Sequence, residues 1–304
     1  MMNQLNELEK LRKKAALCQI VGVGIFVCVF VLFFFSNVTS FFNRGNNLSM
    51  GILFTVFPFA LIGVILCVFS SYYSKEYREK VKTVYVLNCL NQLFEQVEYD
   101  YFRGFDKDYI RSTELVRMGN RYSSNDLISA TYKGNPFQMS DLLIQEESTD
   151  SDGNSHTTTL FSGQWFIFKF KKTFTGYLQL RDREDSVFRN GKPYSIFSNR
   201  ESSKQIKFEN EEFNRAFTSY ASDAQEAFYL ITPHFMEKLL TLKAQLEGKL
   251  LIGFIDNQLH IALNSGKDLF EPSLWKELDA TYQAEVLNDL SVVTSIIDEL
   301  DLAK

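Results

Sequence analysis

The sequence predicts an α+β protein: a two-helix transmembrane hairpin followed by one cytoplasmic α+β domain with a mainly antiparallel sheet. Three observations support this prediction. Two long uncharged runs stand near the N-terminus, aromatic runs with strand-like alternation fill the middle, and amphipathic helical patterns follow. A length of 304 residues fits one or two domains. The composition excludes a disordered chain, a collagen-like chain and a basic nucleic-acid binder.

Charge and phenylalanine are distributed unevenly along the chain, which has a net charge of -5. Residues 1–74 carry five basic and two acidic side chains, a net of +3, and 11 of the 29 phenylalanines. Residues 83–304 carry 23 basic and 33 acidic side chains, a net of -10. A region this acidic disfavours nucleic acid and favours a basic protein partner.

The first predicted transmembrane helix covers residues 15–35 and the second covers residues 51–70. A helix of 21 residues is about 31 Å long, which matches the hydrocarbon core of a bilayer. Tyr72 and Tyr73 follow the second run, where an interfacial aromatic belt would lie. The alternative is a cleaved signal peptide followed by a buried helix. The first run is longer than a signal-peptide core, and no small-x-small cleavage pattern follows it.

The basic residues predict the orientation of this hairpin. The loop at residues 36–50 contains only Arg44, whereas both outer flanks are basic. The positive-inside rule therefore places both termini in the cytoplasm, in an inner or plasma membrane, with the lipid bilayer as a partner. Neither run contains a charge or a filter motif, which favours an anchor over a pore. The flanking basic residues are Lys10, Arg12, Lys13 and Lys14 before the first run, and Lys75, Arg78, Lys80 and Lys82 after the second.

A juxtamembrane helix is predicted next, because apolar residues recur with a helical period from about Lys75 to Val97. Its first turn is basic, which suits anionic lipid headgroups. The predicted organisation is thus residues 1–14 as cytoplasmic N-terminus, 15–35 and 51–70 as transmembrane helices, 36–50 as external loop, 71–104 as juxtamembrane helix and 105–304 as cytoplasmic α+β domain.

Strand patterns begin at about Asp126. Two short strands, at 126–133 and 137–147, flank a turn signal, and the polar residues 148–158 predict a flexible loop. The run at 159–182 is the most β-prone part of the chain, and both of its faces are apolar. Phe166, Phe168 and Phe170 alternate with Trp165 and Ile167, which predicts a central strand covered on both sides. Polar residues around Lys192-Pro193 and 199–203 predict another loop.

The C-terminal part alternates between helices and strands. After a short strand in residues 213–223, Ser222 is a candidate helix N-cap, and Thr232-Pro233 begins a second helix. A hairpin turns at Asp256-Asn257. An amphipathic helix closes the chain, from about Asp279 to Leu300. In the hairpin, the predicted inner face consists of Leu259, Ile261 and Leu263.

Three blocks of sequence stand out in the C-terminal half. They are Phe161-Ser162-Gly163 leading into WFIFKFKKTFTGYLQLRD, the block FENEEFNRAFTSYASDAQEAFYLITPHFMEKL, and GKLLIGFIDNQLHIAL with the following Phe270-Glu271-Pro272. Together these blocks resemble a bacterial membrane-protein family known as domain of unknown function 3137. The resemblance covers roughly residues 160–302. It implies a membrane-anchored cytoplasmic α+β domain, and it implies no activity and no catalytic residue.

The sequence predicts no catalytic, cofactor-binding or metal-binding residue. The three histidines, His156, His234 and His260, form no zinc motif, and no phosphate-binding or nucleophile motif is present. His260 is predicted to face away from the inner side of the hairpin. The acidic clusters Asp182–Asp185 and Glu209–Glu212 are interpreted as solvated charge runs. On balance the sequence favours a protein that is not an enzyme.

Three functions remain open. The leading interpretation is an interaction or scaffold domain that binds a protein, or itself, at the inner face of the membrane. The second is a membrane-anchored enzyme that acts on a lipid or small molecule, which requires a pocket with convergent polar groups. The third is an accessory subunit of a transporter.

Overall fold

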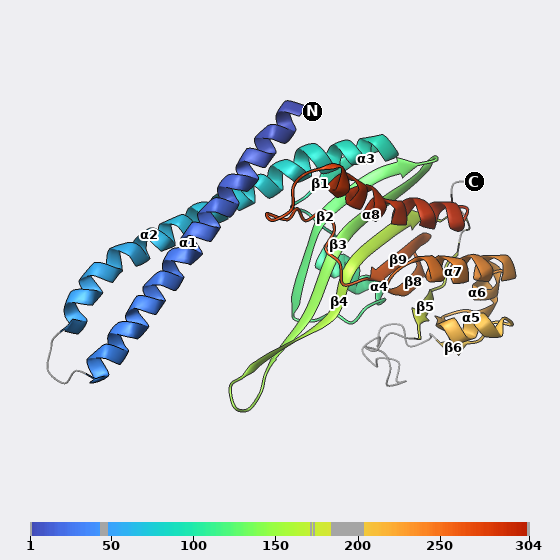
Figure 1. The fold of residues 1–304 in the computed structure, drawn as a ribbon. Helices are drawn as coiled ribbons and strands as arrows, with labels where there is room; N and C mark the ends of the chain where they lie inside the picture. Colours follow the sequence, from blue (N-terminus) through green and yellow to red (C-terminus); the bar gives the residue numbers. More distant parts are fainter. Residues whose placement is uncertain (1, 43–47, 171, 173, 184–203, 303–304) are drawn as a thin grey trace. The chain divides into compact units, whose positions relative to one another are not determined.

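The computed structural model describes residues 2–42, 48–170, 172, 174–183 and 204–302. The chain forms two compact units. The first comprises Met1–Val86 with Glu271–Ala284, and the second comprises Leu87–Phe270 with Glu285–Lys304. The helices are α1 Met2–Phe42, α2 Leu48–Lys80, η1 Val81–Val86, α3 Leu87–Leu93, α4 Lys107–Thr113, α5 Glu211–Ala216, α6 Ala224–Leu230, α7 Pro233–Gln245 and α8 Ala280–Glu299 (Figure 1).

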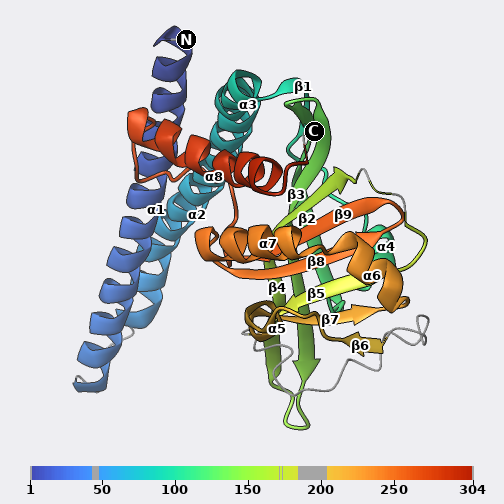
Figure 2. The ribbon, with the colours of Figure 1, turned by 90° about the vertical axis from the view of Figure 1, so that its right-hand side faces the viewer.

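The first unit is built on the antiparallel helices α1 and α2, which lie side by side (Figures 1 and 2). Each contains a stretch that is long and apolar enough to cross a membrane, and together they indicate association with a membrane. The helices approach closely at two glycines: a Cβ on Gly22 would lie 3.3 Å from the Gly63 carbonyl oxygen. The Ser70 hydroxyl donates a hydrogen bond to the Ala15 carbonyl at 3.0 Å.

The 271–284 segment of the first unit lies against these two helices. The Arg12 guanidinium donates to the Leu274 carbonyl at 2.9 Å, and Glu9 accepts from the Leu278 amide at 2.9 Å. Lys82 forms an ion pair with Glu271 at 2.6 Å. The side chains of Arg12 and Lys82 are only 8% and 6% exposed. Buried charges are costly unless paired, so these contacts hold the segment firmly in place.

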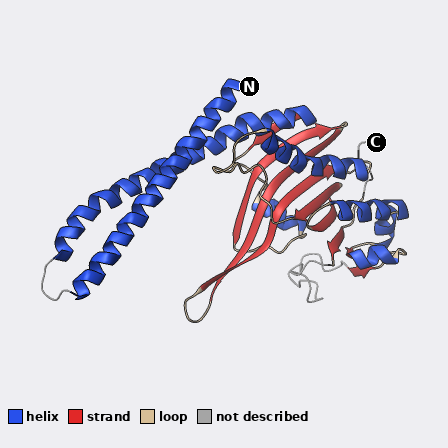
Figure 3. Ribbon diagram, in the orientation of Figure 1, coloured by secondary structure: helices blue, strands red, loops and turns tan. Residues whose placement is uncertain are grey.

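The second unit is organised around one antiparallel sheet, which contains nine strands within the described part of the chain (Figure 3). The strand order is β1-β2-β3-β4-β9-β8-β5-β7-β6. The strands are β1 Glu95–Asp100, β2 Arg121–Tyr132, β3 Asn135–Thr149, β4 Ser155–Lys169, β5 Leu178–Asp182, β6 Lys204–Ile206, β7 Phe217–Ala221, β8 Lys249–Ile255 and β9 Gln258–Asn264.

Both faces of the central strands are covered. On one face Trp165 and Ile167 of β4 pack with Ile110 of α4 in a buried apolar cluster. On the other, α7 and α8 cover the sheet (Figure 2), and Phe166 and Phe168 are fully buried. This confirms the α+β class and the prediction of a central, doubly covered strand.

The structure confirms three further sequence predictions. Asp256 and Asn257 form the turn between β8 and β9, both with positive φ. Thr232 caps α7, because its hydroxyl accepts from the Phe235 amide, and Pro233 occupies the first turn. The last amphipathic helix is α8, Ala280–Glu299.

The predicted juxtamembrane helix is too long. Helical structure ends at Leu93, and Glu95–Asp100 forms the edge strand β1, which pairs with β2. The prediction of a helix was wrong beyond Leu93, where Val97 and Tyr99 also fit the alternation of a strand. The sheet therefore begins within the predicted helix 71–104.

Two local predictions are also wrong. The predicted loop 148–158 is mostly hairpin, since β3 runs to Thr149 and β4 starts at Ser155. Its polar side chains can face solvent on both sides while the backbone hydrogen bonds continue. The N-cap of α6 is Asp223 and not Ser222, whose hydroxyl instead accepts from the Tyr177 amide at 2.8 Å. The predicted loops around Lys192-Pro193 and 199–203 lie outside the described residues.

Candidate functional site

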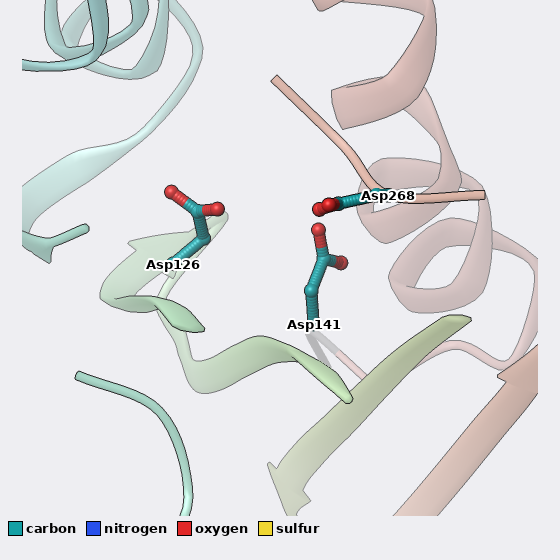
Figure 4. A group of neighbouring side chains, drawn as sticks. All are labelled: Asp126, Asp141 and Asp268. Carbon is teal, nitrogen blue, oxygen red and sulfur yellow. The ribbon is translucent and has the colours of Figure 1, made fainter. Parts of the chain in front are cut away.

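Three carboxylates converge in the second unit, at Asp126, Asp141 and Asp268 (Figure 4). Their ligand atoms all lie within 4.8 Å of one another. Asp126 and Asp141 are buried, and Asp268 is exposed. They come from β2, β3 and the chain that follows β9, so only the folded sheet brings them together.

A β-bulge positions the first of these carboxylates. The register between β2 and β3 shifts between Asn125 and Ile128, and Asp126 has a left-handed backbone with a φ of 57°. Its carboxylate accepts from the Tyr99 hydroxyl, and from the Nδ2 of the Asn125 side chain at 2.6 Å. The bulge interrupts the regular pleating of β2 and leaves the Asp126 side chain buried.

Asp141 connects the sheet to the chain after β9. Its carboxylate accepts from the Leu269 amide at 2.7 Å and from the Gln164 side chain at 3.1 Å. Burial raises its pKa well above the ordinary value, and the nearby charges of Asp126 and Asp268 act in the same direction, against the two hydrogen bonds. The cluster is therefore one in which a proton is readily retained.

The same three residues are the ones that could hold a metal ion. Carboxylate oxygens suit hard cations such as Mg²⁺ and Ca²⁺, which take six or more oxygen ligands. Both oxygens of Asp126 and both oxygens of Asp141 already accept hydrogen bonds. A cation would therefore compete with these hydrogen-bond donors for the carboxylate oxygens.

Sequence reasoning missed this cluster, because its members lie far apart and follow no motif. The available signal was weak: Asp126 begins one predicted strand and Asp141 lies inside the next, and aspartate is disfavoured in strands. Such residues indicate a bulge or a buried polar contact, but not which partner they meet.

His260 faces away from the inner side of the hairpin, as predicted, but that side is also covered. Only 1% of the residue is exposed, and its Nδ1 accepts from the Trp165 indole at 3.2 Å. The Tyr109 ring lies 6.1 Å from the imidazole. Desolvation lowers the pKa of His260 to about 4. The imidazole therefore stays neutral in the folded protein at neutral pH.

His260 should make the stability of the domain fall as the pH falls from about 6.5 to about 4. In this window the imidazole is protonated in the unfolded chain but not in the folded chain. The free energy of unfolding therefore falls by about 3 kcal/mol for a pKa difference of this size. His260→Gln keeps an acceptor for Trp165 and should flatten the dependence, measured by thermal unfolding across this range. The matched control His234→Gln, at a 75% exposed side chain, should leave it intact. Equal slopes for all three proteins would contradict the assignment.

The other two histidines are surface residues. His156 is 67% exposed and lies 3.3 Å from Asp150 in the β3–β4 turn. His234 lies in the first turn of α7, within 4.0 Å of Glu237. Neither histidine lines the hollows at the polar strands or beside α8 that are described below.

The two acidic runs differ in their surroundings. Glu209, Glu211 and Glu212 are exposed, as interpreted from the sequence. Asp182 corrects that interpretation, because its side chain is fully buried at the end of β5 and pairs with Lys243 of α7 at 2.8 Å. The sequence could not show this, since the partner lies on another element. Glu184 and Asp185 lie outside the described residues.

Two of the hollows on the second unit, which is called the sheet domain, are lined by several polar side chains. The larger of these two, the polar trough, has a volume of about 620 Å³ and lies over strands β1 to β4 and the β8–β9 turn. The smaller, about 300 Å³, includes Lys267, Glu247 and Asp289 in its lining, and burial raises the pKa of Asp289. The trough is lined by Gln96, Glu98, Ser129, Ala130, Thr131, Pro136, Phe137, Gln138, Ile167, Lys169, Asp256, Asn257 and Gln258.

Comparison with known proteins finds one family model that matches part of this chain. Residues 159–302 match a family model described as "Protein of unknown function (DUF3137)". A search of curated proteins finds no match. Among solved structures, the chain is distantly similar to the mycobacterial trehalose monomycolate transport factor A, TtfA, with a TM-score of 0.35 and 8% identity over 71% of this chain and 93% of that chain. The family model thus matches residues 159–302, which run from within β4 through α8, and this supports the resemblance to the DUF3137 family that the sequence indicates.

Proposed function

We propose that this chain is a two-pass membrane protein, with both termini in the cytoplasm, whose sheet domain binds a basic segment of a protein partner. The two apolar helices support the membrane anchor. The basic residues that flank them, against a single Arg44 between them, support the orientation. The sheet domain is too large for a simple tail and has its own core.

The polar trough is the observation that carries the binding proposal. Its floor is a row of cross-strand neighbours, in which Glu98 pairs with Ser129, Ser129 with Gln138 and Gln138 with Ile167. Ser129 and Gln138 are also linked by a hydrogen bond of 3.1 Å. Such a surface offers amide and hydroxyl groups on a rigid sheet, which suits specific contacts with another chain.

Electrostatics favours a basic partner. The trough includes the carboxylates of Glu98 and Asp256 beside the single cation of Lys169. Residues 83–304 as a whole carry a net charge of -10. Complementary charge would speed the encounter with a basic segment and disfavour acidic competitors.

The test is capture of partners with charge-altering variants at one position. Full-length protein is crosslinked mildly in cells, extracted in detergent and purified, and the bound proteins are identified by mass spectrometry. Gln138 is exposed, so neither Gln138→Arg nor Gln138→Glu should disturb the fold. Gln138→Arg should reduce capture of the partner about tenfold, a loss of about 1.4 kcal/mol, whereas Gln138→Glu should preserve it.

A second matched control is Gln225→Arg, the same change on an exposed position of α6 outside the trough. It should capture the partner like the unmodified protein. If the unmodified protein and its three variants are all recovered as monomers without a partner, the proposal is contradicted. If the two arginine variants lose the partner equally, the binding surface is not the polar trough. The enzyme alternative concerns the 300 Å³ hollow instead, and it predicts no effect of Gln138→Arg.

A further inference from the structure

The 271–284 segment contacts α1 at two residues, Arg12 and Glu9, that lie at different distances from the apolar run. The apolar run of α1 begins at Ala15. At about 1.5 Å per residue, Arg12 lies about 4.5 Å before this point along the axis, and Glu9 about 9 Å before it. Arg12 holds the Leu274 carbonyl and Glu9 holds the Leu278 amide. The segment therefore comes closer to the apolar run at Leu274 than at Leu278.

The segment's contacts with α2 and η1 lie farther from the apolar runs than its contact at Leu274. This holds for the residues before Leu274 and for the residues after it. Ser70, which contacts Ala15, marks the level of the boundary on α2. Glu271 pairs with Arg78 at 3.6 Å and with Lys82 at 2.6 Å, which lie about 12 and 18 Å beyond Ser70 along the helix. Asp279 and Tyr282 contact Tyr85, which lies farther still.

The segment thus forms a bend whose tip, Leu274-Trp275, points toward the apolar run. Trp275 is 60% exposed at this tip, and Lys276 beside it is exposed as well. The headgroup layer of a bilayer is about 5–7 Å thick on each side of the hydrocarbon core, so the Arg12 level falls within it. We propose that the tip of the 271–284 segment is a membrane-contact site, where Trp275 enters the anionic headgroup layer of the leaflet beside the termini.

The chemistry of the tip suits this lipid surface. The indole is amphipathic and prefers the interface between headgroups and hydrocarbon. The flanks of the apolar runs are rich in lysine: Lys14 lies over the Tyr73 ring at 6.0 Å, and Lys75 is 74% exposed. The acidic Glu277 near the tip pairs with Arg12 at 3.6 Å. Clustered lysines near a membrane helix attract anionic lipids. The paired charges of Arg12 and Lys82 fix the tip in advance, so little ordering cost is left when it meets lipid.

The test uses the fluorescence of full-length protein reconstituted into vesicles. The chain has two tryptophans, and Trp165 is fully buried in the sheet domain. The difference between the unmodified protein and Trp275→Phe therefore isolates the emission of Trp275. Phosphatidylcholine vesicles carry bromine either near the headgroup end of the acyl chains or at mid-chain, with and without phosphatidylglycerol. Trp275 should lose most of its emission with shallow bromine and less with deep bromine, and phosphatidylglycerol should increase the loss.

This inference depends on the proposed membrane insertion, and the experiment separates the two. If the protein does not float with the vesicles after an alkaline wash, the two-pass proposal fails. If the protein floats but the Trp275 emission is unchanged by shallow bromine, insertion holds and the contact site is overturned. Stronger quenching by deep than by shallow bromine would also overturn a headgroup site. High salt should weaken the phosphatidylglycerol effect but not the insertion.

Discussion

Phe168→Asp is expected to unfold the sheet domain. Phe168 is 0% exposed on β4, where it pairs with Phe137 of β3 and Leu259 of β9. Truncating a buried phenylalanine costs about 3–5 kcal/mol, and an unpaired buried carboxylate adds a further desolvation cost. The sum reaches the whole stability of a typical domain, about 5–15 kcal/mol. We therefore expect the variant to lose its cooperative thermal transition and to become sensitive to trypsin.

The matched control is Lys169→Asp, one residue further along the same strand. Lys169 is exposed at the end of β4, so an aspartate there stays in water. This variant should melt within a few degrees of the unmodified protein and resist trypsin equally. A Phe168→Asp protein that melts cooperatively would show that β4 is not buried on both faces.

Regions with a single unambiguous pattern were predicted well from the sequence. The alternation of Trp165, Phe166, Ile167 and Phe168 leaves no polar side for a strand, so both faces must be covered. Likewise, Thr232-Pro233 combines a capping hydroxyl with the imino acid favoured in a first helical turn, and α7 begins there. In both cases the local chemistry alone decides the structure.

The predictions that failed depend on partners distant in the sequence. β1 is a strand because β2 lies beside it, although its residues also fit the end of a helix. The polar ends of β3 and β4 pair through their backbones, with Glu147 opposite Thr157, and composition says nothing about that register. Asp182 is buried and pairs there with Lys243, which lies on α7, far away in the sequence.

The candidate sites were invisible for the same reason. Asp126, Asp141 and Asp268 meet through a bulge and through the return of the chain after β9. The tip at Trp275 could not be located from the sequence, because the segment is held by contacts with Arg12 and Lys82, which are remote in sequence. A one-dimensional pattern can locate an apolar run, but not the segment that folds back beside it.

Gly163→Ala is expected to destabilise the sheet domain by about 3–5 kcal/mol, through backbone strain and steric overlap together. Gly163 has a φ of 150°, and a Cβ at this position would lie 2.1 Å from the Leu263 carbonyl oxygen and 2.9 Å from the Ser265 backbone nitrogen. Both contacts are with backbone, which cannot swing aside as a side chain could. This requirement gives a physical reason for the glycine in Phe161-Ser162-Gly163, part of the resemblance to the DUF3137 family.

Gly153→Ala separates strain from overlap. Gly153 also has a positive φ, 84°, but nothing lies within 4 Å of the position of its Cβ in the β3–β4 turn. This control should therefore cost only about 1 kcal/mol, the penalty of a left-handed alanine. Thermal unfolding followed by the Trp165 emission, in a Trp275→Phe background, reports on the sheet domain without the membrane helices. Equal losses for the two alanine variants would mean that strain alone acts at Gly163, and that β4 and the chain after β9 are less closely apposed than the geometry requires.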